Sequence, residues 1–370
     1  MSLVKKLNFV TLSPECRNIE LVKDVGQIPY VLGKEQNINT AIVASCVDMT
    51  GANLQNVSTL KIINVPMILN NTSLTGVVYL LKNAKNIDWL SLHHAGRRSY
   101  YWTKLYKFLN PKGKVYLKLD MDFRSCDLYD SDIWERKLFQ KNMNIMDLVT
   151  VETQAVKERI QPYSSKEIQV LGNGYCKTEF VPDIYQEREN NFITVGRLGT
   201  EQKATEVLLE AFSLSAEFHE WNLKLVGTIE ENFKDTVKEF FDNHPELVER
   251  VIFAGEIKER EALYNECCKA KVFVLPSRWE GFAIVGGEAL SCGCRVIVSD
   301  QVPPMKEFTN SEKYGQIVPS DDVIALKNAL IDAAKTETTV EETREIANYA
   351  NKQFSWSNIC KQLYSMLIES

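Results

Sequence analysis

The sequence has no long apolar run and no secretion signal. None of its apolar stretches approaches the roughly 20 residues that a membrane-spanning helix needs. The amino terminus also lacks the basic segment, apolar core and small-residue cleavage site of a signal peptide. These absences predict a cytoplasmic protein, so the glycosylation sequons at Asn56, Asn70 and Asn71 are expected to be unused.

The nine cysteines form neither a disulfide pattern nor a metal site. Their number is odd and their positions are scattered, which is typical of a reduced cytosolic chain. The pairs Cys267-Cys268 and Cys292-x-Cys294 lack the spacing and the partners of zinc ligands, so we expect them to be small buried apolar side chains. A recognised nucleic-acid-binding motif is also missing.

Length and composition predict an ordinary soluble protein of two domains. The chain has 370 residues, of which 45% are hydrophobic and 25% charged. Its charge is unevenly divided: residues 1–180 have 23 basic and 17 acidic side chains, whereas residues 181–370 have 20 and 32. A basic first half on a chain with a net charge of −6 indicates an anionic partner for that half.

The most informative stretch runs from residue 271 to residue 300. Its ends, 272–275 and 295–298, are short runs rich in β-branched residues, which predict buried parallel strands. Residues 283–292 between them are predicted to form a helix that Gly293 ends in a left-handed conformation. The loop 277–282 then lies at the carboxyl end of a strand, where open α/β sheets bind ligands.

Two carboxylates frame this predicted helix, Glu280 before it and Glu288 inside it. The first amides of a helix are unpaired and carry partial positive charge, which suits a phosphate or diphosphate. Glu280 would be repelled by that phosphate unless it faces a hydroxyl-rich group such as a sugar, and Glu288 is suited to a ribose diol. Gly286 and Gly287 each cost roughly 1 kcal/mol in a helix relative to Ala, which indicates close approach of a ligand or of neighbouring backbone. The alternative is that neither carboxylate binds a ligand.

The segment PSRWEGFAIVGGEALSCGCRVIVSD, with seven residues between Glu280 and Glu288, resembles the donor-binding segment of the retaining glycosyltransferases of family 4. The resemblance implies that Glu280 faces the donor sugar and that Glu288 holds the nucleotide ribose. It also implies that the diphosphate lies against the backbone at the start of the helix. The residues implied there are Gly281, Phe282, Ala283 and Ile284.

A second segment, VGRLGTEQKA, carries the same resemblance. Arg197 and Lys203 match the Arg and Lys that clamp the diphosphate in the family, whose members usually have Gly where Ala204 stands here. The loop lacks the Gly-Lys-Ser/Thr ending of a Walker loop. The resemblance also places backbone contacts to the nucleobase near Ile257, which leaves the identity of the base open.

The first half of the chain carries weaker signals. His94 follows a predicted strand and is a candidate acid–base group, with a structural role as the alternative. Asp120 stands where the family commonly has a His, so it is expected to orient the acceptor hydroxyl or accept its proton. Asp120-Met121-Asp122 also resembles the metal-binding motif of the GT-A architecture, although the second half favours a metal-free site. The paired glycines of the family are absent after the first strand, and Val25 to Pro29 is the nearest substitute.

Residues 97–114, RRSYYWTKLYKFLNPKGK, have six basic side chains, no acidic ones and several aromatic ones. A helix of this composition suits a membrane surface with anionic headgroups. A solvated basic face over a core stripe is the alternative. The interpretation predicts a cytoplasmic protein that is peripheral on the inner face of the cytoplasmic membrane.

Together these signals predict two Rossmann-like α/β domains that face a central cleft, the GT-B fold. The predicted domains are 1–182 for the acceptor and 190–350 for the nucleotide-sugar, with a helix in 354–370 that crosses back to the first. The predicted function is metal-independent glycosyl transfer with retention, without a cofactor, from a nucleotide-sugar to a glycan or lipid-linked acceptor. Surface polysaccharide or glycoconjugate synthesis is the expected setting, and no nucleic-acid partner is expected. A catalytically silent partner subunit, a nucleotide-sugar epimerase and a sugar-phosphate phosphorylase are the alternatives.

Overall fold

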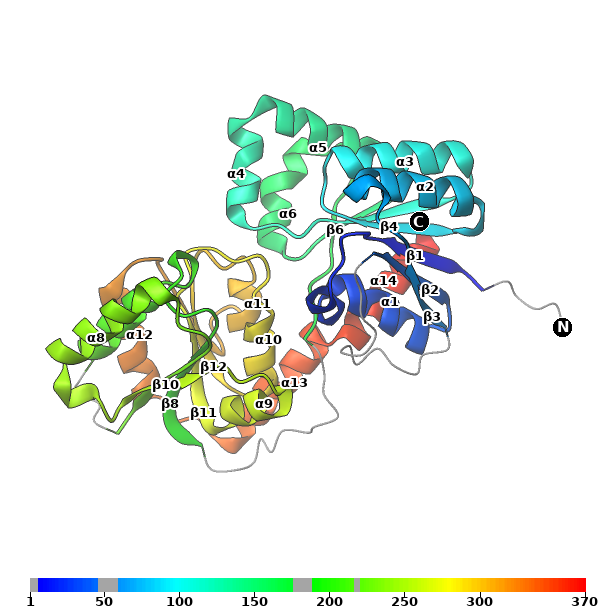
Figure 1. Cartoon of the computed structure of the whole chain (residues 1–370). Helices are drawn as coiled ribbons and strands as arrows, with labels where there is room; N and C mark the ends of the chain where they lie inside the picture. Colours follow the sequence, from blue (N-terminus) through cyan, green and yellow to red (C-terminus); the bar gives the residue numbers. More distant parts are fainter. Residues whose placement is uncertain (1–5, 46–58, 176–187, 216–219) are drawn as a thin grey trace. The chain divides into compact units, whose positions relative to one another are not determined.

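The computed structural model describes residues 6–45, 59–175, 188–215 and 220–370. The chain divides into two compact units, unit 1 with residues 1–176 and 354–370 and unit 2 with residues 177–353 (Figure 1). The predicted domain boundary at 182 lies outside the described residues. Within the described ranges, no helix is both long and apolar enough to cross a membrane.

Unit 1 is built on a seven-stranded parallel sheet with the order β3-β2-β1-β4-β5-β6-β7. Strands such as β1 and β5 are apolar and mostly buried, because a parallel sheet is covered on both faces. The order reverses between β1 and β4, and such a switch point leaves a crevice at the carboxyl ends of the two strands. The strands are β1 (Asn8–Leu12), β2 (Asn39–Ala44), β3 (Leu60–Asn64), β4 (Trp89–His93), β5 (Lys114–Lys118), β6 (Leu148–Val151) and β7 (Gln169–Val170).

Helices cover both faces of this sheet (Figure 1). On one face α1 and α14 pack together over a core that includes Phe9, Leu32 and Leu363. The carboxyl-terminal helix α14 is therefore part of unit 1. The helices are α1 (Asp24–Glu35), α2 (Thr72–Asn83), α3 (Arg97–Leu109), α4 (Phe123–Ser131), α5 (Ile133–Ile145), α6 (Gln154–Ile160) and α14 (Trp356–Glu369).

Two helical elements lie between β1 and β2, a 3-10 turn at Asn18–Val22 and α1. Gly26 lies in the first turn of α1 against the backbone of Leu21, where a Cβ atom would approach the Leu21 carbonyl oxygen to 2.2 Å. The glycine is therefore required by packing between the turn and the helix. Gly26 needs no ligand to explain it.

Unit 2 has a six-stranded parallel sheet with the order β10-β9-β8-β11-β12-β13. Its switch point lies between β8 and β11, the strands that precede the two predicted donor-binding loops. The strands are β8 (Glu189–Val195), β9 (Asn222–Val226), β10 (Val251–Gly255), β11 (Ala270–Leu275), β12 (Arg295–Ser299) and β13 (Gly315–Val318).

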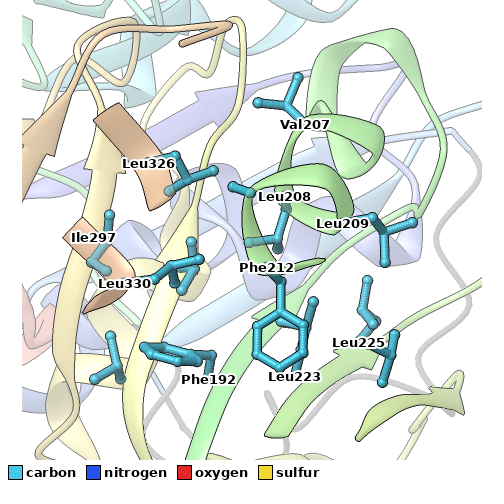
Figure 2. Packing of buried hydrophobic residues seen from close by; sticks show 14 of the residues in the cluster. Phe192, Val207, Leu208, Leu209, Phe212, Leu223, Leu225, Ile297, Leu326 and Leu330 are labelled. Carbon is cyan, nitrogen blue, oxygen red and sulfur yellow. The ribbon is translucent and has the colours of Figure 1, made fainter. Parts of the chain in front are cut away.

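Figure 1 shows α8 and α12 on one side of this sheet and α9, α10 and α11 on the other. Figure 2 shows Leu208 and Phe212 of α7 beside Leu326 and Leu330 of α12, above Phe192 of β8. Fully burying such side chains contributes about 1.5–3 kcal/mol each. The helices are α7 (Thr205–Ser213), α8 (Lys234–Asn243), α9 (Arg260–Lys269), α10 (Ile284–Ser291), α11 (Met305–Thr309), α12 (Val323–Lys335) and α13 (Val340–Phe354).

Candidate functional site

The two loops at the switch point of unit 2 are joined by hydrogen bonds. The first loop connects β8 to α7, and the second connects β11 to α10. The Arg278 amide donates to the Gln202 carbonyl oxygen at 2.8 Å, and Gln202 Nε2 donates to the Trp279 carbonyl oxygen at 3.0 Å. The residues predicted to bind the two ends of a donor are thus held on one scaffold.

Glu280 lies at the centre of this scaffold and is only 6% exposed. Lys203 Nζ donates to Glu280 Oε1 at 2.5 Å, and Ser277 Oγ donates to the same oxygen at 2.8 Å. Gln202 Nε2 donates to the other carboxylate oxygen at 3.3 Å. The carboxylate is therefore oriented by three side chains, of which Ser277 and Gln202 had not been singled out from the sequence.

Arg197 follows β8 and is exposed. Its guanidinium donates to Gln202 Oε1 at 3.4 Å, and it forms no salt bridge with any carboxylate of the described residues. Because it donates only one hydrogen bond within the described part of the chain, the Arg197 guanidinium keeps N–H donors for a bidentate contact with phosphate oxygens.

The start of α10 offers backbone rather than side chains to a ligand. Phe282 is 5% exposed and packs edge to face on Phe308, with ring centroids 5.7 Å apart. Ala283 adopts a left-handed conformation with φ 55° and directs the chain into α10, whose first residue is Ile284. The side chain of Phe282 is thus part of the core. The predicted donor contact at Phe282 is therefore assigned to its main-chain groups, whereas Gly281, Ala283 and Ile284 are half-buried.

Packing explains one of the two glycines in α10. A Cβ atom on Gly286 would come within 2.4 Å of the Phe308 ring. Close approach of a neighbouring side chain, rather than of a ligand, is therefore sufficient to require glycine there.

Glu288 is buried in α10 and pairs with Arg260, the first residue of α9. Burial raises the pKa of Glu288, and the guanidinium of Arg260 opposes that shift. Ile257 is half-buried in the loop between β10 and α9, three residues before Arg260. Arg260 had not been predicted from the sequence, although its position just after a strand's carboxyl end was a signal for it.

Ala204 has a φ of 48°, in the left-handed region, and is fully buried. Glycine, which the resembling family usually has at this position, adopts that conformation without steric cost. An alanine there costs roughly 1–2 kcal/mol. The fold therefore maintains the loop geometry after Lys203 despite the substitution.

In unit 1 the two neighbouring histidines are in different environments. His94 is exposed and has a φ of 60°. The His93 side chain is 10% exposed, and its Nε2 lies 3.5 Å from Asp24 Oδ2. Burial lowers the pKa of His93 to about 4, although Asp24 partly offsets this effect. His93 therefore belongs to the polar interior at the end of the sheet, and the predicted His94 lines the same cavity from an exposed position.

Lys118 at the end of β5 is fully buried and donates to Glu152 Oε1 at 2.7 Å. Asp120, two residues later, is an exposed residue with a φ of 87°. The protein matrix around its carboxyl, and then Glu152 and Asp24, raise the pKa of Asp120 to about 7. Asp24, Lys118 and Glu152 had been missed by the sequence interpretation, yet Glu152 directly follows an apolar strand as Asp120 does.

Asp122 has a local structural role. Its side chain accepts hydrogen bonds from the Ser125 amide at 2.7 Å and from Ser125 Oγ at 2.5 Å, and it caps α4. An aspartate used as a helix cap accounts for the second member of the Asp-x-Asp pattern.

The helix α3, which was predicted to bind membranes, has one buried and one exposed face. Trp102 and Tyr106 are buried and donate to the carbonyl oxygens of Ser73 and Ile87. Tyr101 and Phe108 are 65% and 82% exposed. Only part of the aromatic content of this segment is therefore available to a partner.

The architecture is GT-B. Solved structures that are similar over nearly the whole chain are GT-B glycosyltransferases. HepE of Anabaena, solved in complex with UDP, has a TM-score of 0.71 at 15% identity, with 99% of this chain and 100% of that chain covered. At this level of identity the likeness establishes the fold.

The segment that forms unit 2 is similar to a known enzyme family. Residues 178–353 match the family model described as "Glycosyl transferases group 1". An uncharacterized glycosyltransferase of Methanocaldococcus jannaschii is 27% identical over 238 residues, which is 58% of each chain. The phosphatidyl-myo-inositol mannosyltransferase of Mycobacterium leprae is 25% identical over 183 residues, 48% of this chain and 46% of that one. The chain thus matches about half the length of these curated relatives.

Proposed function

We propose that the protein is a hexosyltransferase that moves a sugar from a nucleotide-sugar donor to a glycan or lipid-linked acceptor. The observation that carries the proposal is the arrangement in unit 2 of the Lys203–Glu280 pair, the buried Arg260–Glu288 pair and Arg197, which forms no salt bridge with a described carboxylate. The family match and the glycosyltransferase relatives support it. Synthesis of a surface polysaccharide or glycoconjugate is the biological role that we propose.

In this proposal unit 2 binds the donor through three kinds of group. Arg197, Lys203 and the first amides of α10 neutralise the negative charge that develops on the leaving diphosphate. Glu280 positions the transferred sugar, and Glu288 accepts hydrogen bonds from the ribose hydroxyls. UDP is a candidate nucleotide, because HepE was solved with it. We propose that these protein cations make a metal cofactor unnecessary.

The proposed reaction retains the anomeric configuration, as the resemblance to family 4 implies. The bond between the anomeric carbon and the phosphate oxygen breaks, and a bond to the acceptor oxygen forms on the same face of the ring. The acceptor proton passes to the leaving phosphate. Unit 1 binds the acceptor, where Asp120 and the residues around His93 and His94 orient the attacking hydroxyl.

We further propose that unit 1 binds an anionic membrane surface through α3. The exposed face of the helix alternates cations and aromatic rings, with Arg97, Tyr101, Lys104 and Phe108 at helical spacing. Cations attract anionic headgroups, and aromatic side chains insert at the interface. The name of the Mycobacterium leprae relative includes a lipid, phosphatidyl-myo-inositol, which supports a lipid-linked acceptor.

Calorimetric titration with UDP-, GDP-, ADP- and dTDP-sugars tests the donor site. One of these donors should bind, and Arg197→Ala should weaken its affinity about tenfold or more, since a contact to a charged group contributes roughly 1.5–3 kcal/mol. Lys203→Ala should do the same, but it also leaves the buried Glu280 without its cation. Lys238→Ala, at an exposed lysine of α8, is the matched control. Unchanged donor affinity in both site variants would refute the diphosphate clamp.

The alternatives predict different products. A silent partner subunit would bind a nucleotide-sugar without turnover, with or without an acceptor. An epimerase would convert the donor sugar into an isomer in the absence of any acceptor. Product analysis by mass spectrometry and NMR therefore separates both alternatives from glycosyl transfer.

A further inference from the structure

A cavity of about 150 Å³ lies in unit 1 at the carboxyl ends of β1 and β4. Ser13 and Glu15 line it from the segment after β1, and Glu20 lines it from the 3-10 turn. His93 lines it from the end of β4, and Arg98 and Trp102 line it from α3. The sheet order reverses between these two strands, so the cavity occupies the switch point of unit 1. Nothing in the proposed donor site uses it.

Several buried polar atoms around this cavity have no hydrogen-bond partner among the described residues. They include Glu15 Oε2, His93 Nδ1 and Thr11 Oγ1 in β1. The other ring nitrogen of His93, Nε2, faces Asp24 Oδ2 at 3.5 Å. Buried polar atoms are nearly always hydrogen-bonded. These atoms therefore indicate that a hydrogen-bonding molecule enters the cavity.

The unpartnered atoms require hydrogen-bond donors from that molecule. The free oxygen of Glu15 is an acceptor. Burial lowers the pKa of His93 to about 4, so the imidazole is neutral near pH 7. Its Nε2 faces the Asp24 carboxylate and carries the proton, which leaves Nδ1 as an acceptor. A hydroxyl or ammonium group donates to such acceptors, whereas a phosphate dianion supplies acceptors alone.

The charge around the cavity also disfavours an anion. Glu15 and Glu20 line it, and Asp24 lies behind His93. The lining cation Arg98 is already paired with Glu15, and the nearby Lys118 with Glu152. The carboxylates thus outnumber the available cations, and a phosphate in the cavity would be repelled.

We propose that this cavity binds a single neutral or amine-bearing sugar unit of the acceptor and rejects phosphorylated sugars. The assignment to the acceptor rests on the proposed function. A typical ligand pocket has a volume of about 300–1,000 Å³, so a cavity of about 150 Å³ holds one small unit rather than an oligosaccharide. An ammonium group on that sugar forms a charge-assisted hydrogen bond with the free oxygen of Glu15.

Histidine-labelled NMR of the full chain tests the proposal. The chain has four histidines, so the ring signal of His93 can be assigned from its loss in His93→Gln. The probes are a methyl hexopyranoside, its 2-amino-2-deoxy counterpart and a hexose 6-phosphate. The methyl hexopyranoside and the amino sugar should each shift the His93 signal until the shift saturates, and the amino sugar should bind more tightly. The hexose 6-phosphate should leave the His93 signal unchanged.

Two variants with opposite expected effects separate recognition from loss of folding. Glu15→Gln should reduce the affinity for the amino sugar about tenfold, since one charge-assisted contact is lost. Arg98→Gln should leave Glu15 uncompensated and increase the preference for the amino sugar over the neutral one. Glu158→Gln makes the same charge change at an exposed residue of α6 and should alter neither affinity.

Either of two results would overturn the proposal. If no sugar shifts the His93 signal, the cavity holds only water, and if the hexose phosphate binds best, the charge argument is wrong. Titration of the same sample with the nucleotide-sugar donor distinguishes a failure of the acceptor subsite from a failure of the proposed function. Intact donor binding without sugar binding refutes the acceptor subsite alone, and the reverse result refutes the donor site alone.

Discussion

Glu280 and Glu288 are both 6% exposed, but each is held by a different cation. Lys203 and Ser277 orient Glu280 beside the loop that is proposed to hold the transferred sugar. Arg260 orients Glu288 inside α10. The two carboxylates therefore act on different parts of the donor in the proposed function, and substitutions at them should have different kinetic signatures.

Glu280→Gln is expected to lower kcat more than it raises KM for the donor. The sugar ring gains positive character as the diphosphate leaves, so a carboxylate there stabilises the transition state more than the ground state. Glu288→Gln should mainly raise KM, because the ribose is remote from the bond that breaks. Steady-state kinetics on the purified variants measure both effects. Equal changes in KM alone would show that Glu280 only binds the donor.

The buried His93 makes the stability of the protein depend on pH. Its pKa falls from 6.5 to about 4 on folding. Between these values the unfolded chain binds more protons than the folded one, so stability should decrease as pH falls from about 6.5 towards 4. The loss attributable to His93 between pH 6.5 and 4.5 is about 2 kcal/mol.

Urea titrations at these two pH values measure the effect. His93→Gln should lose most of this pH dependence, whereas His244→Gln at a half-exposed position should keep it. Asp120 acts in the opposite direction, because its raised pKa of about 7 favours the folded state at low pH. Asp120 is present in the wild type and in both variants, so its contribution cancels when each variant is compared with the wild type. An unchanged pH dependence in His93→Gln would show that His93 is not buried in neutral form.

At the scale of the elements, the loops after β8 and β11 depend on two left-handed alanines, Ala204 and Ala283. Each is the residue that directly precedes a helix, α7 or α10. Left-handed backbone is unfavourable for alanine, so the surrounding contacts must maintain it. The geometry of the donor loops is therefore enforced by packing and by the hydrogen bonds of Gln202.

Ala204→Gly should have little effect on the free energy of unfolding. The change removes a buried methyl group and adds chain entropy to the unfolded state, but it relieves roughly 1–2 kcal/mol of backbone strain. Ala211→Gly, inside α7 at an equally buried position, has no such relief and should cost roughly 1–2 kcal/mol. Urea unfolding of both variants gives the difference. Equal destabilisation would argue against strain at Ala204.

At the scale of the whole molecule, the proposed binding to an anionic membrane rests on the basic first half of the chain and on α3. Liposome sedimentation should show binding to anionic but not to neutral vesicles, and binding should weaken with salt, because the Debye length is ~8 Å at physiological ionic strength. Lys104→Gln and Phe108→Ser should each reduce it, and Lys238→Gln in unit 2 should not. Equal sedimentation with both vesicle types at low salt would exclude this partner.

Local sequence was sufficient to predict many of the elements. Strands in a parallel sheet are buried on both faces, so the apolar runs 272–275 and 295–298 correctly predicted β11 and β12. The helices α2, α4 and α5 had not been predicted, because their mixed sequences lack a long apolar stripe. Composition alone left a membrane face and a core stripe open for residues 97–114, and the register of α3 places Trp102 and Tyr106 in the core.

The sequence by itself determined which residues follow the carboxyl ends of strands, among them Arg197, Glu280 and Asp120. Tertiary structure decided which of these side chains meet. The partner of Glu280 lies 77 residues away in Lys203, and Arg260 lies 28 residues before Glu288. It also decided that His93, the last residue of β4, lies beside Asp24 of α1, 69 residues earlier in the chain. Such pairings depend on strand order and register, which arise from packing over the whole sheet and leave no local pattern.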